Sequence, residues 1–493
     1  MQRAAGILLH PTSLPGPHGI GTLGAPARHW IDTLAESGVR WWQILPLGPT
    51  GFGHSPYQCY SAFAGNALLI DPDRLRSEGL LHEGDLIAPD TFEERRVAYE
   101  EVIRRNDGWL RKAFSRFAPA GHYQRFCAEH AGWLEDYALF MALLEYFNFR
   151  EWTDWPENIR LREPETMAYY ASVLGDEADY HRFVQYCFFS QWEALKAYAG
   201  AKGVGIIGDL PIYVAMNSAD VWANPQLFQL DDALQPTRVA GVPPDYFSAT
   251  GQRWGNPLFD WDAMEKNGFA WWIKRLNASL ELYDMVRIDH FRGFEAYWSI
   301  PADEETAVNG EWIKGPDRKL FDAFKAALGA ELPIIAEDLG IITPEVEALR
   351  DGYGLPGMKI LQFAFASDAA NPYLPHNHIP GCVVYTGTHD NDTTNGWFYA
   401  EPPEEAERAH TMRYLDCRWE AFHKTLNRTA LASPAALAVL PLQDLLGLGS
   451  DARMNTPGTV EGNWEWRVTQ QQLGDAPWDD LKAMCELYGR ARG

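Results

Sequence analysis

Short apolar runs recur along the chain, each bounded by glycine, proline or other turn residues. Segments with apolar residues at helical spacing lie between these runs. Runs of strand length that alternate with helical patterns are typical of a parallel sheet built from strand-helix units. Eight such runs predict an α/β protein with a (β/α)8 barrel, whose functional side chains lie at the carboxyl ends of the strands. The predicted strands are residues 6–9, 41–46, 204–212, 285–290, 333–339, 358–365, 382–388 and 438–442.

The spacing between the predicted strands is uneven, which indicates large insertions in a single catalytic domain of residues 1–493. The gap after the second strand is too long for a connecting loop, so residues 65–177 are predicted to form an inserted, largely helical subdomain. A second insertion follows the third strand, at residues 213–261. Its prolines and glycines at 241–257 predict a shaped loop with little regular structure. Helices are expected at residues 25–36, 182–202, 262–282, 318–328 and 344–350.

The fourth predicted strand is unusual because its apolar run carries Arg287 and Asp289. Side chains two apart in a strand share a face, so both point the same way, while Val286 and Ile288 point the other way. An arginine beside an aspartate lowers the pKa of the carboxyl group and keeps it ionised. A carboxylate nucleophile requires this arrangement, and so does a purely structural ion pair.

Three other predicted strands also end in carboxylates. The third ends at Asp209, the fifth at Glu337 and Asp338, and the seventh just before Asp390. Parallel strands of a barrel deliver these side chains to one rim. Helix capping is the structural alternative for the Glu337-Asp338 pair.

A rim of carboxylates, one arginine and histidines fits either a metal site or a glycosidase site. The clustered histidine motifs that usually supply metal ligands are missing from the sequence, so we favour glycoside chemistry and expect no metal. Retaining glycosidases use one ionised and one protonated carboxyl group, roughly 5 Å apart. Glu337 has no arginine on its own strand, so neighbouring carboxylates are expected to raise its pKa.

Composition narrows the function further. The formal net charge of −25 argues against a nucleic-acid partner, because phosphate binding needs a basic surface. The six cysteines show no metal-ligand spacing, and no apolar stretch predicts a signal peptide or a membrane span. We therefore expect a soluble, cytoplasmic protein. Some of the 20 tryptophans lie in loops rich in glycine and proline, where flat rings suit the C–H faces of sugars.

Several motifs resemble a known family. The sequence RIDH at 287–290, Glu337 on the fifth strand and His389-Asp390 on the seventh are similar to the shared motifs of the α-amylase superfamily. More narrowly, the chain resembles the 4-α-glucanotransferases called amylomaltases or disproportionating enzymes along almost its whole length. The motifs that carry this likeness are HPTSLP at 10–15, SPYQ at 55–58, the loop at 241–257 and GTHDNDT at 387–393.

The resemblance implies roles for individual residues. Asp289 would be the nucleophile, Glu337 the general acid/base and Asp390 the stabiliser of the transition state. Trp254 would lie on the loop that arches over the cleft, and Tyr57 would stack on the sugar. The implied substrate-binding residues are Arg287, His389, Asp209, Tyr57, Trp254, Asp338, His290, Ser55 and Asn463. The resemblance also implies that no separate C-terminal β-domain follows the barrel.

The predicted reaction transfers part of an α-1,4-glucan to the 4-hydroxyl group of another maltooligosaccharide or of glucose, with retention and without a cofactor. Tyr246, Phe247 and Trp254 are predicted to help a sugar acceptor outcompete water. The alternatives are an α-glucan hydrolase with the same catalytic residues and a non-catalytic glucan-binding protein. The sequence does not predict the oligomeric state.

Overall fold

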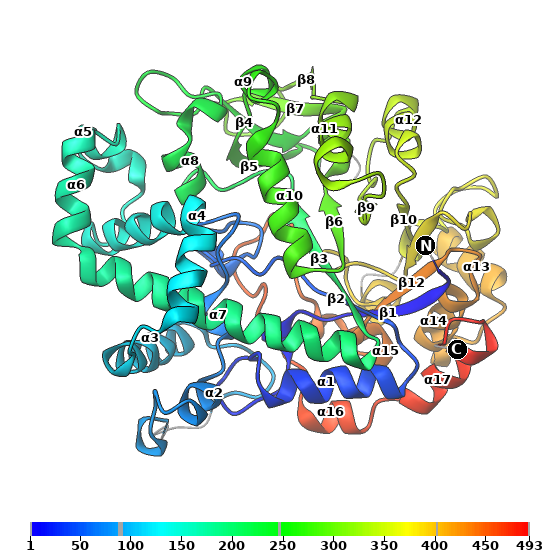
Figure 1. Ribbon diagram of the computed structural model, residues 1–493. Coiled ribbons are helices and arrows are strands. Elements are labelled where there is room, and N and C mark those ends of the chain that lie inside the picture. The colour runs from blue at the N-terminus through cyan, green and yellow to red at the C-terminus, as the bar shows by residue number, and fades with distance from the viewer. Residues whose placement is uncertain (1, 87–91, 245–247, 401–402, 492–493) are drawn as a thin grey trace.

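A closed barrel of eight parallel strands forms the centre of the computed structural model (Figure 1), which describes residues 2–86, 92–244, 248–400 and 403–491. The order around the barrel is β1-β12-β11-β10-β9-β6-β3-β2. All eight predicted strands are present, so the predicted (β/α)8 fold is confirmed. The barrel strands are β1 (Ala4–Leu8), β2 (Trp41–Gln43), β3 (Gly205–Pro211), β6 (Met285–Asp289), β9 (Ile334–Ala336), β10 (Gly357–Ile360), β11 (Cys382–Tyr385) and β12 (Leu437–Pro441).

The side chains of β6 alternate between two environments, as the sequence predicts. Val286 and Ile288 are fully buried in the apolar layer between the barrel and its helices. Arg287 and Asp289 point to the other side, where Ile207 and Ile335 of the neighbouring strands fill the barrel interior. The barrel interior is therefore apolar around Ile207 and Ile335 and charged at the carboxyl end of β6.

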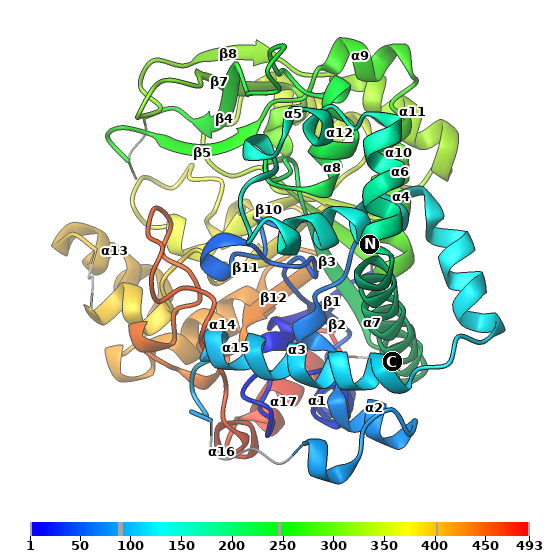
Figure 2. The ribbon, with the colours of Figure 1, turned by 90° about the vertical axis from the view of Figure 1, so that its left-hand side faces the viewer.

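Most of the segment between β2 and β3 is helical (Figure 2). The longest helices here, α4 and α7, pack against each other along their lengths. The latter begins at Gly175, earlier than the predicted start at residue 182, and ends at Gly203, whose φ of 73° allows the left-handed conformation of a helix cap. The helices of this segment are α2 (Pro72–Ser77), α3 (Tyr99–Arg116), α4 (Gly121–Tyr146), α5 (Glu157–Arg160), α6 (Pro164–Val173) and α7 (Gly175–Lys202).

The segment after β3 contains more regular structure than predicted. A four-stranded antiparallel sheet, in the order β5-β4-β7-β8, lies beyond the carboxyl ends of the barrel strands (Figure 2). The expectation of an irregular loop at 241–257 was wrong, because Gly241 lets β4 and β5 approach closely: a Cβ there would lie 2.2 Å from the carbonyl oxygen of Gln252. The strands are β4 (Arg238–Val242), β5 (Gln252–Pro257), β7 (Ala296–Pro301) and β8 (Glu311–Lys314). Tyr246 and Phe247 lie outside the described residues.

The predicted helix at 262–282 is two helices. Gly268 and Phe269 have φ values of 69° and 57°, so the chain turns between α9 and α10. Asn267-Gly268 is a helix-ending signal that the apolar spacing had obscured. The remaining helices are α1 (Ala25–Glu36), α8 (Ala219–Ala223), α9 (Trp261–Lys266), α10 (Ala270–Leu282), α11 (Arg318–Leu328), α12 (Pro344–Gly352), α13 (Glu405–Leu415), α14 (Phe422–Ala432), α15 (Leu442–Leu446), α16 (Gln470–Gly474) and α17 (Trp478–Leu487).

The described residues after β12 form helices and loops and add no further strand. Within the part of the chain that the structure describes, no helix has both the length and the apolar character needed to cross a membrane.

Candidate active site

Three neighbouring barrel strands, β3, β6 and β9, bring Asp209, Asp289 and Glu337 to one rim. In the register of the sheet, Asp209 on β3 pairs with Arg287 on β6, and Ile288 on β6 pairs with Ala336 on β9. Asp289 and Glu337 are therefore the next residues on adjacent strands. The peptide N–H of Glu337 donates to Ile288 at 3.1 Å, which continues the ladder to the strand ends. The sheet itself sets the two carboxyl groups side by side.

Arg287 is the electrostatic centre of this rim. Its side chain is only 4% exposed. One terminal nitrogen lies 2.6 Å from Asp209 Oδ2, and the other lies 2.9 Å from Asp289 Oδ1. The Tyr57 hydroxyl donates to the same Asp209 oxygen at 2.9 Å. Arg287 thus fixes the nucleophile candidate, and Asp209 links Arg287 to Tyr57.

Glu337 is held by backbone donors and is almost fully buried. The N–H of His290 donates to Oε2 at 2.6 Å, and that of Leu339 donates to Oε1 at 2.8 Å. His290 adopts a left-handed conformation with a φ of 54°, at the turn where its N–H meets Glu337. Burial, and then the negative charge of Asp289, raise the pKa of Glu337 to about 8. The predicted rise is confirmed in direction, although burial is its largest cause.

Asp289 differs from the prediction. Arg287 does lower the pKa of Asp289, but burial raises it by more, so the net result is a pKa of about 6. The Asp289 side chain is still 29% exposed, unlike that of Arg287, so it opens toward the cleft. The two carboxyl groups are consequently inequivalent: Glu337 retains its proton to a higher pH than Asp289.

The end of β11 supplies the third carboxylate. His389 Nε2 lies 3.4 Å from Asp390 Oδ1, and the His389 ring stacks on Tyr57 with 5.2 Å between centroids. The Asp390 side chain is 45% exposed, so it is available to a ligand. This stack connects the β11 end to Asp209 through the Tyr57 hydroxyl. One set of contacts therefore joins Asp289, Arg287, Asp209, Tyr57, His389 and Asp390.

Trp254 approaches the same site from β5. Its ring meets the edge of the His290 ring at a centroid distance of 4.9 Å. Among the residues that the structure describes, buried His290 Nε2 has no hydrogen-bond partner. The antiparallel sheet therefore reaches the rim beside His290.

The three other predicted binding residues are engaged in local structure. Asp338 accepts from the N–H of Met358 at 2.7 Å and pairs with Arg350. Asn463 bonds Thr456 and Thr459 within its own loop, and Ser55 Oγ accepts from the Tyr57 N–H at 3.3 Å. Ser55 and Asn463 shape segments beside the rim, whereas Asp338 joins β9 to β10 and α12.

Sequence reasoning missed two residues that contact the rim. Asn455 donates from Nδ2 to Asp390 Oδ1 at 2.6 Å, and Arg453 donates to the Asp390 carbonyl oxygen at 2.8 Å. Both lie in the segment after α15, far from β11 in sequence, and no local pattern there indicates such contacts. Only the fold brings them to Asp390.

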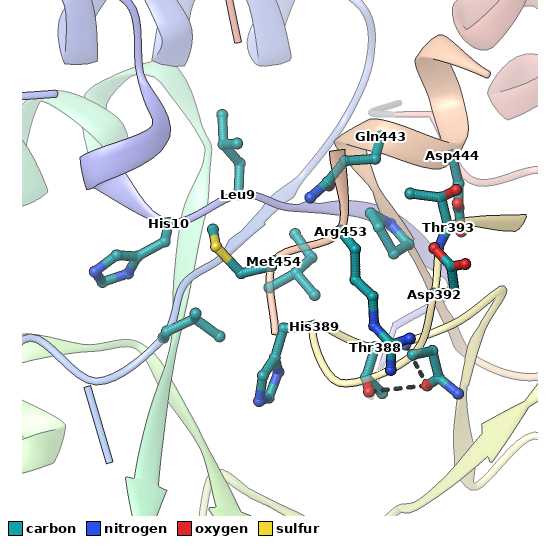
Figure 3. Close-up of a pocket in the computed structure, with 14 residues that line it drawn as sticks. Leu9, His10, Thr388, His389, Asp392, Thr393, Gln443, Asp444, Arg453 and Met454 are labelled. Carbon is teal, nitrogen blue, oxygen red and sulfur yellow. Dashed lines mark hydrogen bonds between the residues drawn. The ribbon is translucent and has the colours of Figure 1, made fainter. Parts of the chain in front are cut away.

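A small pocket is lined in part by His389 (Figure 3). His10, Met454 and Gln443 line it, and Figure 3 shows Arg453 extending toward the turn after β11. The rim carboxylates do not form a metal-ligand cluster among the described residues. The group of side chains close enough to hold an ion is instead His18, Asp71 and Asp73, at the start of α2.

A (β/α)8 barrel whose rim sets an arginine-bound aspartate beside a buried, protonated glutamic acid defines an enzyme that acts on glycosidic bonds by the retaining route. A sequence model described as 4-alpha-glucanotransferase matches residues 9–472, and the chain belongs to this family. The prediction of a 4-alpha-glucanotransferase is thereby confirmed, and the alternative of a hydrolase is not favoured.

Individual relatives agree along their full lengths. The chain is 53% identical to the 4-alpha-glucanotransferase of a Synechocystis species, with 99% of this chain and 98% of the relative covered. It is 51% identical to that of Thermus thermophilus, with 99% of both chains covered. The structure superimposes on the amylomaltase from Streptococcus agalactiae in complex with acarbose with a TM-score of 0.96, at 41% identity and with both chains fully covered.

Proposed function

We propose that Asp289 is the nucleophile, Glu337 the general acid/base and Asp390 the stabiliser of the transition state for transfer of an α-1,4-glucan segment. The observation that carries this assignment is the unequal environment of the first two residues. Arg287 binds Asp289 at 2.9 Å, whereas burial keeps Glu337 protonated to about pH 8. An ionised nucleophile beside a protonated acid is the starting state that retaining chemistry needs.

The first half of the reaction breaks the glycosidic bond. An Asp289 oxygen attacks the anomeric carbon while the leaving oxygen takes the proton of Glu337, so a β-linked glycosyl-enzyme and a shortened glucan form. Positive charge develops on the sugar ring. Asp390, with a side chain that opens into the cleft, stabilises this charge by binding sugar hydroxyl groups more strongly in the transition state.

The second half restores the α linkage. The 4-hydroxyl oxygen of an acceptor attacks the anomeric carbon, its proton passes to Glu337, and the bond to Asp289 breaks. The acceptor is a maltooligosaccharide or glucose. Trp254 supports transfer over hydrolysis, because its ring beside His290 offers an apolar face to a sugar and displaces water near Glu337.

The remaining site residues bind the sugar around the scissile bond. Arg287, Asp209 and His389 provide polar groups, and Tyr57 provides a ring face that its stack on His389 holds in place. We also assign a substrate-binding role to His290, whose ring contacts Trp254. We assign Ser55, Asn463 and Asp338 supporting positions, because their polar atoms already bond neighbouring protein groups.

We also propose that residues 1–493 form one catalytic domain with inserted subdomains at about 65–177 and 213–261. The inserted helices and the β4/β5 hairpin support this division. No cofactor enters the proposed chemistry. An α-glucan carries no charge, so its binding does not require a basic surface. We also infer a cytoplasmic role in maltodextrin metabolism.

Glu337→Gln tests the assignment. The variant should fold and bind acarbose but lose turnover of maltotriose by several orders of magnitude, because glutamine cannot supply the proton. Glu347→Gln, an exposed change on α12, is the control and should retain full activity. Products are separated by chromatography, and total reducing ends are counted.

Transfer predicts glucose together with longer glucans at a constant number of reducing ends. A steady rise in reducing ends would refute transfer, and near-normal turnover by Glu337→Gln would remove the acid/base assignment.

A further inference from the structure

The segment 453–455, which follows β12 and α15, holds the turn after β11 through three hydrogen bonds, and a fourth bond lies within the segment. The Asn455 side chain donates to Asp390 Oδ1 at 2.6 Å, and the Asn455 backbone N–H donates to the His389 carbonyl oxygen at 3.1 Å. Arg453 donates to the carbonyl oxygens of Asp390 and Asn455, each at 2.8 Å. One guanidinium thus ties the two chain segments together at the point where Asn455 meets Asp390.

These contacts leave the two oxygens of Asp390 in different situations. Both Asn455 and His389 approach Oδ1. No hydrogen bond to Oδ2 occurs within the described residues. With the side chain 45% exposed, Oδ2 is the oxygen that remains open to a sugar hydroxyl. A carboxylate held at one oxygen is fixed in rotation, so the direction of the other oxygen is fixed as well.

We propose that Asn455 is a positioning residue: its amide holds Asp390 at Oδ1 and aims Oδ2 at the sugar in the transition state. This inference rests on the proposed role of Asp390. Asn455 does not touch the reacting atoms in the mechanism, and it acts through Asp390. Pre-orientation matters here because a half-exposed side chain would otherwise lose rotational freedom during the reaction.

The segment does not depend on the Asn455 side chain to keep its place. Met454 is buried and packs in the barrel interior, and its carbonyl oxygen accepts from the Trp464 N–H at 2.8 Å. Arg453 and the Asn455 backbone supply three further bonds. Truncation of the Asn455 side chain therefore removes one contact to a carboxylate and leaves the path of the chain intact.

Two substitutions separate positioning from packing. Asn455→Ala should lower kcat roughly 10- to 100-fold, the size expected for a lost hydrogen bond to a charged group, with little change in KM. Asn455→Asp keeps the shape of the side chain but places a like charge against Asp390, so it should lose more activity than Asn455→Ala. If packing alone mattered, Asn455→Asp would be the milder change.

Asn427→Ala is the matched control. Asn427 is a buried asparagine that donates to the Asp444 carbonyl oxygen at 2.9 Å, so its loss should lower the midpoint of thermal unfolding. Because Asn427 does not contact Asp390, kcat at a temperature where the variant is folded should be unchanged.

A double-mutant cycle with Asp390→Ala gives the decisive test, with α-maltosyl fluoride as an activated donor so that low rates can be measured. If Asn455 acts through Asp390, Asn455→Ala should have almost no further effect in the Asp390→Ala background. An equal loss in both backgrounds would overturn the positioning role. Near-normal activity of Asp390→Ala alone would instead overturn the proposed function, so the two failures are distinguishable.

Discussion

At the scale of single residues, the site separates two carboxyl groups by their surroundings. Glu337 is 8% exposed and receives two backbone N–H groups, while Asp289 opens to the cleft and bonds Arg287. The negative charge of Asp289 also raises the pKa of Glu337, so the two groups are linked in their titration. Their order is set by Arg287, which lies in contact with Asp289 and only near Glu337.

This order predicts a bell-shaped dependence of kcat/KM on pH. Asp289 must be ionised, so activity falls as the pH drops through its pKa of about 6. Glu337 must be protonated, so activity falls as the pH rises through its pKa of about 8. Because Arg287 lowers the pKa of both groups, Arg287→Met should move both limbs to higher pH besides lowering the rate. Limbs that stay fixed or move down would contradict this electrostatic role.

The positions of the candidate catalytic residues were predictable, but their energetics were not. Arg287 and Asp289 stand out because charges interrupt an apolar strand, and strand alternation then fixes their direction. The sequence predicts the partner of Asp289 but not the depth of its burial. Desolvation of Asp289 depends on all the residues that surround the rim. Its effect on the pKa of Asp289 outweighs that of Arg287. Asn455 was missed for the same reason, since its contact exists only after the barrel closes.

At the scale of secondary structure, apolar runs predicted every barrel strand, whereas interruptions within patterns were harder to read. The break between α9 and α10 and the β4/β5 pair both depend on single glycines, Gly268 and Gly241. Each glycine lies where backbone geometry, and not burial, decides the structure. Hydrophobic spacing reports burial, so it identifies the core strands and passes over these turns.

The pair of Asp338 and Arg350 illustrates how elements are joined behind the rim. Asp338 follows β9, bonds the N–H of Met358 on β10, and pairs with Arg350 of α12. The Asp338 side chain is 2% exposed. Gly357 provides the space, because a Cβ there would lie 2.3 Å from an Asp338 oxygen. Three elements thus meet at one buried carboxylate.

Arg350→Met should therefore destabilise the fold by about 3 kcal/mol or more, since it leaves Asp338 buried without its cation. The free energy of unfolding is measured with urea. We expect kcat to stay near normal, because Asp338 uses both oxygens within the protein. Unchanged stability together with lost activity would instead make Asp338 a substrate ligand. Arg318→Met is a suitable control. Arg318 bonds the carbonyl oxygen of Ala348 on the same helix, α12, but has no ion pair among the described residues.

At the scale of the whole molecule, the candidate catalytic residues and the buried Arg490 lie at opposite ends of the barrel. The charged residues lie at the carboxyl ends of the strands, and the strands β1 and β12, which close the barrel, pair over their full length. At the amino ends of these two strands lies Arg490, which is fully buried. It donates five hydrogen bonds, and their acceptors are the carbonyl oxygens of Ala4, Leu431, Ser433, Ala435 and Ala436.

This arrangement predicts that stability and turnover can be separated. Arg490→Met removes all five donors and leaves several buried carbonyl groups with fewer partners, so the free energy of unfolding should fall by more than about 2 kcal/mol. Arg490→Lys keeps the positive charge but lacks the planar set of donors. It should therefore recover only part of the free energy of unfolding that Arg490→Met loses. Where the variants remain folded, kcat and KM for maltotriose should match the parent protein, because the Arg287 network at the opposite end of the barrel is untouched. A large change in kcat at full folding would show that the amino end of the barrel controls the geometry of the rim.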